Sequence, residues 1–118
     1  MPKEYVPYHK TVTIAQNATV SGVFRKPAGI TFMGALFPAM DDGAIGLELS
    51  IDNGSNFYPL LDALDGSDAV LAASGQDPGI IDFSDFVRFV PDLAAMQLRF
   101  TCASQTTAEV DIEVVGAG

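Results

Sequence analysis

The residues best suited to catalysis are few in this chain and lie far apart. His9 is the sole histidine and Cys102 the sole cysteine. A Ser/His/Asp or Cys/His arrangement would need the N-terminal segment around His9 to fold into a pocket. Cys102 occupies an apolar position in the alternating segment of residues 96–102, as a small buried hydrophobic side chain does in a strand. We therefore expect no catalytic residue and a protein that is not an enzyme.

Side chains that could hold a metal ion are concentrated in one loop. Asp62, Asp65 and Asp68 recur at every third residue around Gly66, and oxygen-rich loops can bind calcium. Their spacing differs from the alternating ligands of an EF-hand. Aspartates also populate turns, because their carboxylates accept hydrogen bonds from nearby backbone amides. We expect no cofactor and no metal site, although the sequence leaves open whether these three aspartates hold calcium.

Four side chains are candidates for contact with a partner: Tyr5, Tyr8, His9 and Tyr58. The first three belong to residues 1–10, which show no sustained period and so predict an extended arm. An arm of this kind is either a disordered tail or a strap that lays its tyrosines on a neighbouring subunit. Tyr58 directly follows Phe57, so the two side chains point to opposite faces of a strand and one of them is exposed.

The charge balance disfavours nucleic acid and anionic membranes as partners. The 118 residues carry a net charge of -9, which repels phosphate unless the cations are gathered in one patch. The six lysines and arginines are scattered along the sequence. No segment has the apolar core of a signal peptide, and none approaches the ~18 apolar residues of a membrane span. We expect a chain made in the cytoplasm, with neither nucleic acid nor membrane as partner.

The elements that would position these residues are strands, and the clearest is a hairpin over residues 45–61. Leu47, Leu49 and Ile51 alternate with polar residues, as in a strand with one buried face. Asp52-Asn53-Gly54 follows and tolerates the positive φ of a tight turn. We expect the three apolar side chains in the core and residues 52–56 at an exposed tip.

Further strands are predicted on both sides of this hairpin, over residues 11–15, 19–25, 30–37, 69–73, 96–102 and 108–115. The apolar run of residues 30–37 is nearly continuous, which is typical of a strand covered on both faces. Residues 80–95 predict a short strand and then an irregular or helical excursion, in which Ser84 could cap a helical turn. In residues 108–115 the acidic side chains alternate with valine and isoleucine, and they would discourage foreign pairing if that strand lay at an edge.

Together these segments predict one all-β domain over residues 11–118, preceded by the arm of residues 1–10. Many short apolar runs separated by Gly, Pro, Asn and Asp are typical of an antiparallel β-sandwich, here with about eight strands. A hydrophobic fraction of 48% is sufficient for a packed core.

Three of these segments also carry a family likeness. Residues 34–38 read Gly-Ala-Leu-Phe-Pro, an apolar strand that ends in proline. Residues 49–60 contain a hairpin that leads to an aromatic pair, and residues 96–100 read Met-Gln-Leu-Arg-Phe. In this order, over about residues 12–115, the chain resembles small β-sandwich structural proteins of tailed-bacteriophage virions.

The resemblance implies a jelly-roll-like sandwich with a structural role and supplies no catalytic residue. It implies a virion protein of the capsid decoration or cement type, which would bind the major capsid protein or other virion proteins in the assembled shell. Such a protein would act as a homo-oligomer, for which we favour a trimer. The alternatives are a neck or tail accessory protein and a glycan-binding β-sandwich module.

Overall fold

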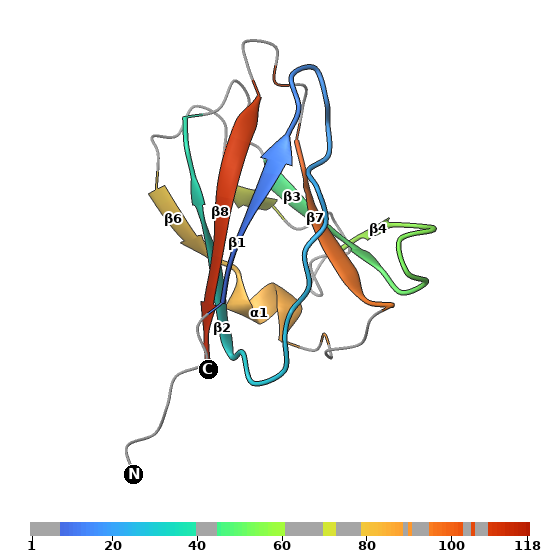
Figure 1. Ribbon diagram of the computed structural model, residues 1–118, viewed down its shortest axis with the longest axis vertical. Helices are drawn as coiled ribbons and strands as arrows, with labels where there is room; N and C mark the ends of the chain where they lie inside the picture. The colour runs from blue at the N-terminus through green and yellow to red at the C-terminus, as the bar shows by residue number, and fades with distance from the viewer. Residues whose placement is uncertain are drawn as a thin grey trace.

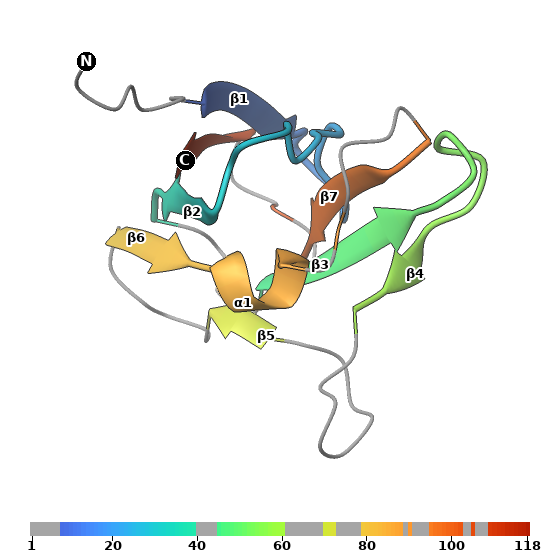
Figure 2. The ribbon, with the colours of Figure 1, turned by 90° about the horizontal axis from the view of Figure 1, so that it is seen from below.

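Two antiparallel β-sheets pack face to face, as Figures 1 and 2 show. The computed structural model describes residues 8–39, 45–60, 70–72, 79–88, 90, 95–102, 105 and 109–118. Within these ranges, the only helix is α1 (Ser84–Val87), a single turn at one end of the sandwich. The all-β sandwich predicted from the sequence is therefore confirmed.

Each sheet is built from strands that are distant in sequence. Across the first sheet the order is β1 (Tyr8–Ile14), β8 (Val110–Ala117), β2 (Phe32–Phe37) and β6 (Gly79–Asp82). The second sheet has β3 (Ile45–Ser50) at its centre, with β7 (Gln97–Thr101) on one side and both β4 (Tyr58–Pro59) and β5 (Val70–Ala72) on the other. The acidic strand β8 is thus interior, between β1 and β2, and not at an edge.

Residues 20–24 lie beside β7 without forming a regular strand. The two ends of this segment make single antiparallel bridges with β7, whereas Ser21 makes one with Ile14 at the end of β1. The segment therefore bonds to both sheets, and the strand predicted for residues 19–25 is broken into isolated bridges. Counted with this segment, the chain crosses several times between the sheets: β1, β2, β6 and β8 belong to the first, and β3, β4, β5 and β7 to the second.

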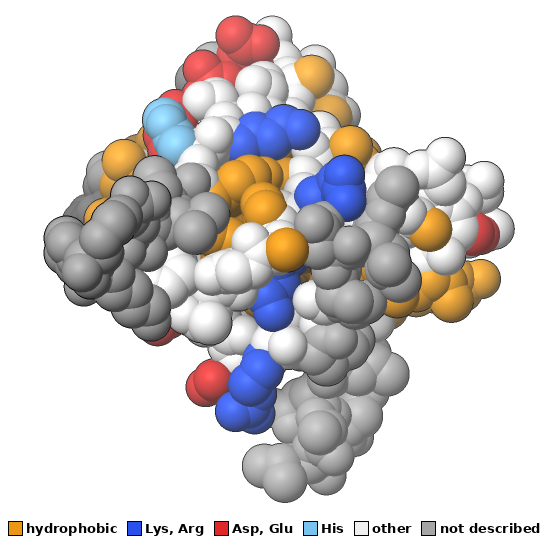
Figure 3. All heavy atoms as spheres, turned by 60° about the horizontal axis from the view of Figure 1, so that its bottom comes forward, with side chains coloured by type: hydrophobic (Ala, Val, Ile, Leu, Met, Phe, Trp, Pro, Cys, Tyr) orange, Lys and Arg blue, Asp and Glu red, His pale blue; other side chains and the backbone are white. Residues whose placement is uncertain are grey.

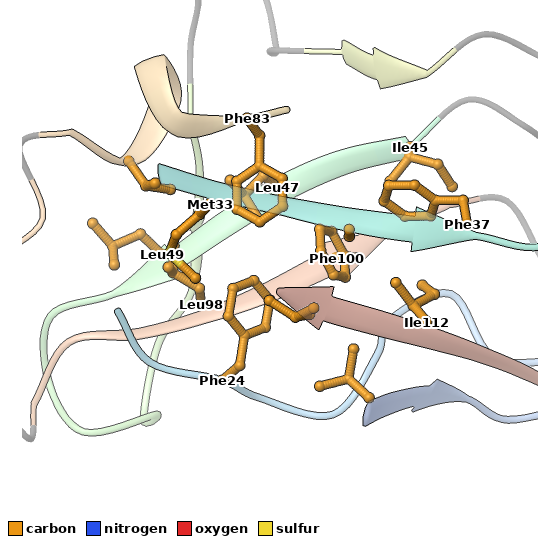
Figure 4. Close-up of a cluster of buried hydrophobic side chains, with 14 of the residues drawn as sticks. Phe24, Met33, Phe37, Ile45, Leu47, Leu49, Phe83, Leu98, Phe100 and Ile112 are labelled. Carbon is orange, nitrogen blue, oxygen red and sulfur yellow. The ribbon is translucent and has the colours of Figure 1, made fainter. Parts of the chain in front are cut away.

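Four phenylalanine rings join the two sheets in the core (Figure 4). The ring of Phe100, from β7, lies 5.0 Å from that of Phe24, 5.2 Å from Phe37 and 5.7 Å from Phe83, measured between centroids. All four are fully buried, at 0% exposure. Because Phe37 belongs to β2 of the first sheet, this cluster ties one sheet to the other. The other buried apolar side chains are Val12, Ile14, Ile30, Met33, Ala35, Ile45, Leu47, Leu49, Val87, Val90, Leu98, Val110, Ile112 and Val114.

The central hairpin is present, but its apolar stripe is shorter than predicted. Leu47 and Leu49 are buried, whereas Ile51 is 60% exposed. The expectation for Ile51 is wrong because β3 ends at Ser50, whose hydroxyl oxygen accepts hydrogen bonds from the amides of Asp52 (3.3 Å) and Gly54 (2.8 Å). The turn therefore begins one residue earlier than simple alternation suggests.

Ser84 has a different role from the one predicted. It is the first residue of α1, and its hydroxyl oxygen accepts a hydrogen bond from the Met33 amide of β2 at 2.8 Å. The carboxylate of Asp82 accepts hydrogen bonds from the hydroxyl of Ser84 (2.6 Å) and from its amide (2.9 Å), which lowers the pKa of Asp82. Ser84 thus anchors the helix to the first sheet and does not cap it.

Candidate functional site

The strand β1 begins at Tyr8, so two of the predicted arm residues, Tyr8 and His9, belong to the first sheet. Tyr8 lies opposite Gly116 of β8 and packs half-buried against the core. A Cβ atom at Gly116 would lie 2.9 Å from the Phe32 carbonyl oxygen and 3.5 Å from the Tyr8 Cβ. Glycine at this position therefore permits the close approach of the Phe32 carbonyl, whereas the Tyr8 Cβ lies at an ordinary contact distance.

The Tyr8 side chain forms part of a cavity of about 340 Å3. Its other described lining residues are Lys10, Arg25 and Pro27. Burial raises the pKa of the Tyr8 phenol, and this outweighs the opposite effects of a hydrogen bond from the Arg25 backbone and of the Arg25 charge. The phenol is therefore neutral at physiological pH, with its proton available for donation.

His9 points away from this cavity, because adjacent residues of a strand face opposite sides. On the outer face of the first sheet, the carboxylate of Glu113 bonds to the His9 ring and accepts a hydrogen bond from the Thr11 hydroxyl at 2.7 Å. These bonds, the one from Thr11 above all, lower the pKa of Glu113. The same pattern recurs along the strands, where Thr13 donates to Asp111 at 2.7 Å. The acidic side chains of β8 therefore bond across to β1.

Tyr58 lies on the second sheet, in β4, and is 59% exposed. Its neighbour Phe57 is half-buried beneath the Arg99 guanidinium, whose carbon lies 3.9 Å from the ring centroid. Arg99 also donates from Nε to the Glu48 carboxylate at 2.7 Å. The expectation that one of the two adjacent aromatic side chains is exposed is confirmed, and Tyr58 is the exposed one.

The hairpin tip next to Tyr58 is held by one carboxylate. Asp52 accepts hydrogen bonds from the side chain (2.7 Å) and the amide (2.9 Å) of Asn56, and from the Ser50 hydroxyl (2.8 Å). These bonds, led by the Asn56 side chain, lower the pKa of Asp52 to about 2. Asn53 and Gly54 have φ values of 61° and 86°, as the turn prediction requires. The predicted exposed tip is therefore confirmed as an ordered turn.

The candidate partner-binding residues do not converge on one site. Tyr8 and His9 lie on opposite faces of β1, and Tyr58 lies in the other sheet. Tyr5 and the aspartates 62, 65 and 68 fall outside the described residues. Cys102 is half-buried against the core and accepts a hydrogen bond from the Gln105 amide nitrogen at 3.6 Å.

The sequence did not single out an apolar surface on the outer face of β2 and β6. Leu36 and Ile80 lie directly opposite each other in these strands and are 41% and 67% exposed, and Phe32 is 39% exposed. The sequence feature that could have revealed this surface is the nearly continuous apolar run of residues 30–37, which predicts a strand covered on both faces. In the single chain one face of this strand is open, and exposed apolar patches on soluble proteins mark interaction surfaces.

The cations are less scattered in space than in sequence. Lys10 and Arg25 line the same cavity, and the Lys26 ammonium donates to the carbonyl oxygens of Val87 (3.1 Å) and Arg88 (3.2 Å). Figure 3 shows this end of the molecule, where Lys and Arg side chains form a band around exposed hydrophobic groups and most Asp and Glu side chains lie near the outline. Lys10 and Arg25 are brought to one cavity because residues 20–31 pass alongside β1 and α1.

Metal-binding clusters and membrane-spanning helices are both absent from the residues that the structure describes. Among those residues, no group of three or more His, Cys, Asp and Glu side chains has the geometry to hold a metal ion. Likewise, none of the described helices has the length and apolar character needed to cross a membrane.

Comparison with known proteins gives a likeness in fold. No protein-family model matches the sequence, and no curated protein sequence matches it. Among solved structures, the SPBc2 prophage-derived protein YomS aligns over 96% of both chains, with a TM-score of 0.50 and 14% identity. The chain is similar in fold to YomS.

A second solved structure is more distant than YomS. It comes from the Bacillus endospore appendages that form disulfide-linked pili, and it covers 98% of this chain and 90% of that chain, with a TM-score of 0.33 and 8% identity. The likeness to YomS runs nearly from end to end of both chains.

Proposed function

We propose that this chain is a structural protein of a tailed-bacteriophage particle, where it decorates and cements the capsid as a homo-oligomer, with a trimer favoured. The observation that carries the proposal is the fold likeness to the prophage-derived YomS over 96% of both chains. The family likeness of the hairpin and of the neighbouring strands points the same way. The function requires no catalytic residue, and the described histidine and cysteine are engaged in structural hydrogen bonds.

The architecture suits a protein that binds a preformed surface. The two sheets are clamped by a continuous core, so the outer faces are rigid and lose little conformational freedom on binding. The outer face of β2 and β6 supplies Phe32, Leu36 and Ile80 as an apolar centre, as in the core of a protein–protein interface. A protein that binds only the assembled shell stabilises it by mass action.

The proposal is tested with phage particles that lack the protein and are then loaded with purified chain. We expect the loaded particles to survive heating that inactivates the bare ones. The double variant Leu36→Ser/Ile80→Ser should bind the particle weakly and restore little heat resistance. Val23→Ser removes an exposed hydrophobic side chain, 39% exposed, from the segment beside β7, and as the matched control it should restore resistance fully. Equal survival of bare and loaded particles would contradict the cementing role.

A glycan-binding role is the second candidate, and the exposure of Tyr58 favours it. The ring is 59% exposed and lies next to the ordered hairpin tip, so a sugar face could stack on it. A glycan array probed in the presence of calcium tests this role. Binding that is lost in Tyr58→Ala would support it, and the absence of any bound glycan would exclude it.

A further inference from the structure

Two cationic side chains and a phenol line the cavity formed by Tyr8, Lys10, Arg25 and Pro27. We propose that it is a binding site for a carboxylate-bearing segment of a partner protein. The inference rests on the position of two cations and a phenol around a space of about 340 Å3. It holds whether or not the chain decorates a capsid.

Lys10 occupies the core-facing side of β1. The side chains of Val12 and Ile14 on the same strand are buried in the core, and alternation places the Lys10 side chain on that same face. Its cross-strand partner, Val114, is also buried. A lysine at a core-facing position is unusual, because burial of an ammonium without compensation is costly. Here the cost is avoided because Lys10 is exposed to solvent, and it lines the cavity.

The described carboxylates of the neighbouring strand β8 do not form ion pairs with Lys10. Glu113 and Asp111 of β8 lie on the outer face of the sheet, where they accept hydrogen bonds from Thr11 and Thr13. Within the part of the chain that the structure describes, the Lys10 ammonium has no hydrogen-bond or ion-pair partner. In a chain of net charge -9, the Lys10 ammonium is thus available to form an ion pair with a carboxylate from another molecule.

The other lining groups fit a carboxylate. A guanidinium such as that of Arg25 presents parallel N–H donors that match the two oxygens of a carboxylate. The Tyr8 oxygen already accepts a hydrogen bond from the Arg25 backbone, which leaves the phenolic O–H to donate to a bound oxygen. Pro27 supplies an apolar wall for the methylene groups of a glutamate or aspartate side chain.

Charge and size distinguish this ligand from nucleic acid. Each strand of duplex DNA carries one phosphate per ~3.4 Å, so a nucleic acid would extend well beyond the cavity over a chain whose net charge is -9. The volume is at the lower end of small-ligand pockets, which span roughly 300–1,000 Å3, and so accommodates one or two side chains. The Lys26 ammonium is held instead by the Val87 and Arg88 carbonyls.

The test is an NMR titration of the full, isotope-labelled chain with a blocked acidic peptide, acetyl-Gly-Glu-Ala-Glu-Gly-amide. We expect saturable shifts of the amides of Tyr8, Lys10 and Arg25. Lys10→Gln and Arg25→Gln should each weaken binding about tenfold, because each removes one charge-assisted hydrogen bond. Arg88→Gln removes a cation that does not line the cavity, so it is the matched control and should leave the affinity unchanged. A melting curve of each variant establishes that it is folded.

Several results would overturn the proposal. One is the absence of saturable shifts, and another is an equal response to the peptide with glutamine in place of glutamate. A third is an equal loss in Arg88→Gln, which would indicate nonspecific attraction to the whole face. Tighter binding of a short oligothymidylate than of the acidic peptide at the same ionic strength would assign the site to nucleic acid.

Discussion

Replacing Phe100 by alanine removes the central ring of the phenylalanine cluster that joins the two sheets. Its ring is fully buried and lies within 5.0 to 5.7 Å of three other phenylalanine rings, between centroids. Truncation of a buried phenylalanine costs about 3–5 kcal/mol, and the loss of three ring contacts places this site toward the upper end. Since domains of this size are stabilised by about 5–15 kcal/mol, the substitution should remove a large share of the total.

The assay is urea unfolding followed by far-ultraviolet circular dichroism, because the chain has no tryptophan. With a slope of about 1.5 kcal/mol per molar urea, the midpoint for Phe100→Ala should fall by about 2–3 M. Phe100→Leu retains most of the volume and should cost about 1–2 kcal/mol, which keeps the test open if the alanine variant does not fold. Tyr58→Ala, at an exposed position, should change the free energy of unfolding by less than about 0.5 kcal/mol. A loss below about 1 kcal/mol for Phe100→Ala would refute the idea that this cluster clamps the sheets.

Three further predictions concern the hairpin tip and the apolar outer face. The pKa of Asp52 is lowered from 3.8 to about 2 in the folded chain. The carboxylate therefore stabilises the fold fully above about pH 4, and this stabilisation is lost as the pH falls through about 2. In Asp52→Asn the melting temperature should fall less steeply with pH across this window, and an unchanged slope would contradict the prediction. Gly54→Ala places a Cβ at a φ of 86° and should cost about 1–2 kcal/mol in urea unfolding. Gly22→Ala, where no atom lies within 4 Å of the added Cβ, should cost clearly less, and equal losses would refute the strain argument. Ile80→Ser should leave the melting temperature nearly unchanged while it weakens binding to phage particles, measured by co-sedimentation; a large drop in melting temperature would show that Ile80 supports the fold itself.

The sequence predicted the elements whose periodicity is governed by local chemistry. The alternation of valine and isoleucine with acidic residues correctly predicted the strand β8, and Asp52-Asn53-Gly54 correctly marked the turn. These features depend on neighbours in sequence, because side-chain alternation and positive φ are local properties.

The features that sequence reasoning missed depend on contacts between distant segments. Ile51 leaves the core because the Ser50 hydroxyl starts the turn early, and Ser84 bonds to β2 where a helix cap was expected. Lys10 and Arg25 meet only because residues 20–31 pass beside β1. Contacts of this kind leave no periodic pattern in the sequence from which they could be predicted.

The central claim is that the chain is a building block of a phage particle and decorates its shell. Quantitative mass spectrometry of purified particles, with the major capsid protein as the internal standard, tests it most directly. We predict that the chain is present in hundreds of copies, at a fixed ratio to the major capsid protein. A few to a few dozen copies would place it in the neck or tail, and its absence from purified particles would contradict the account.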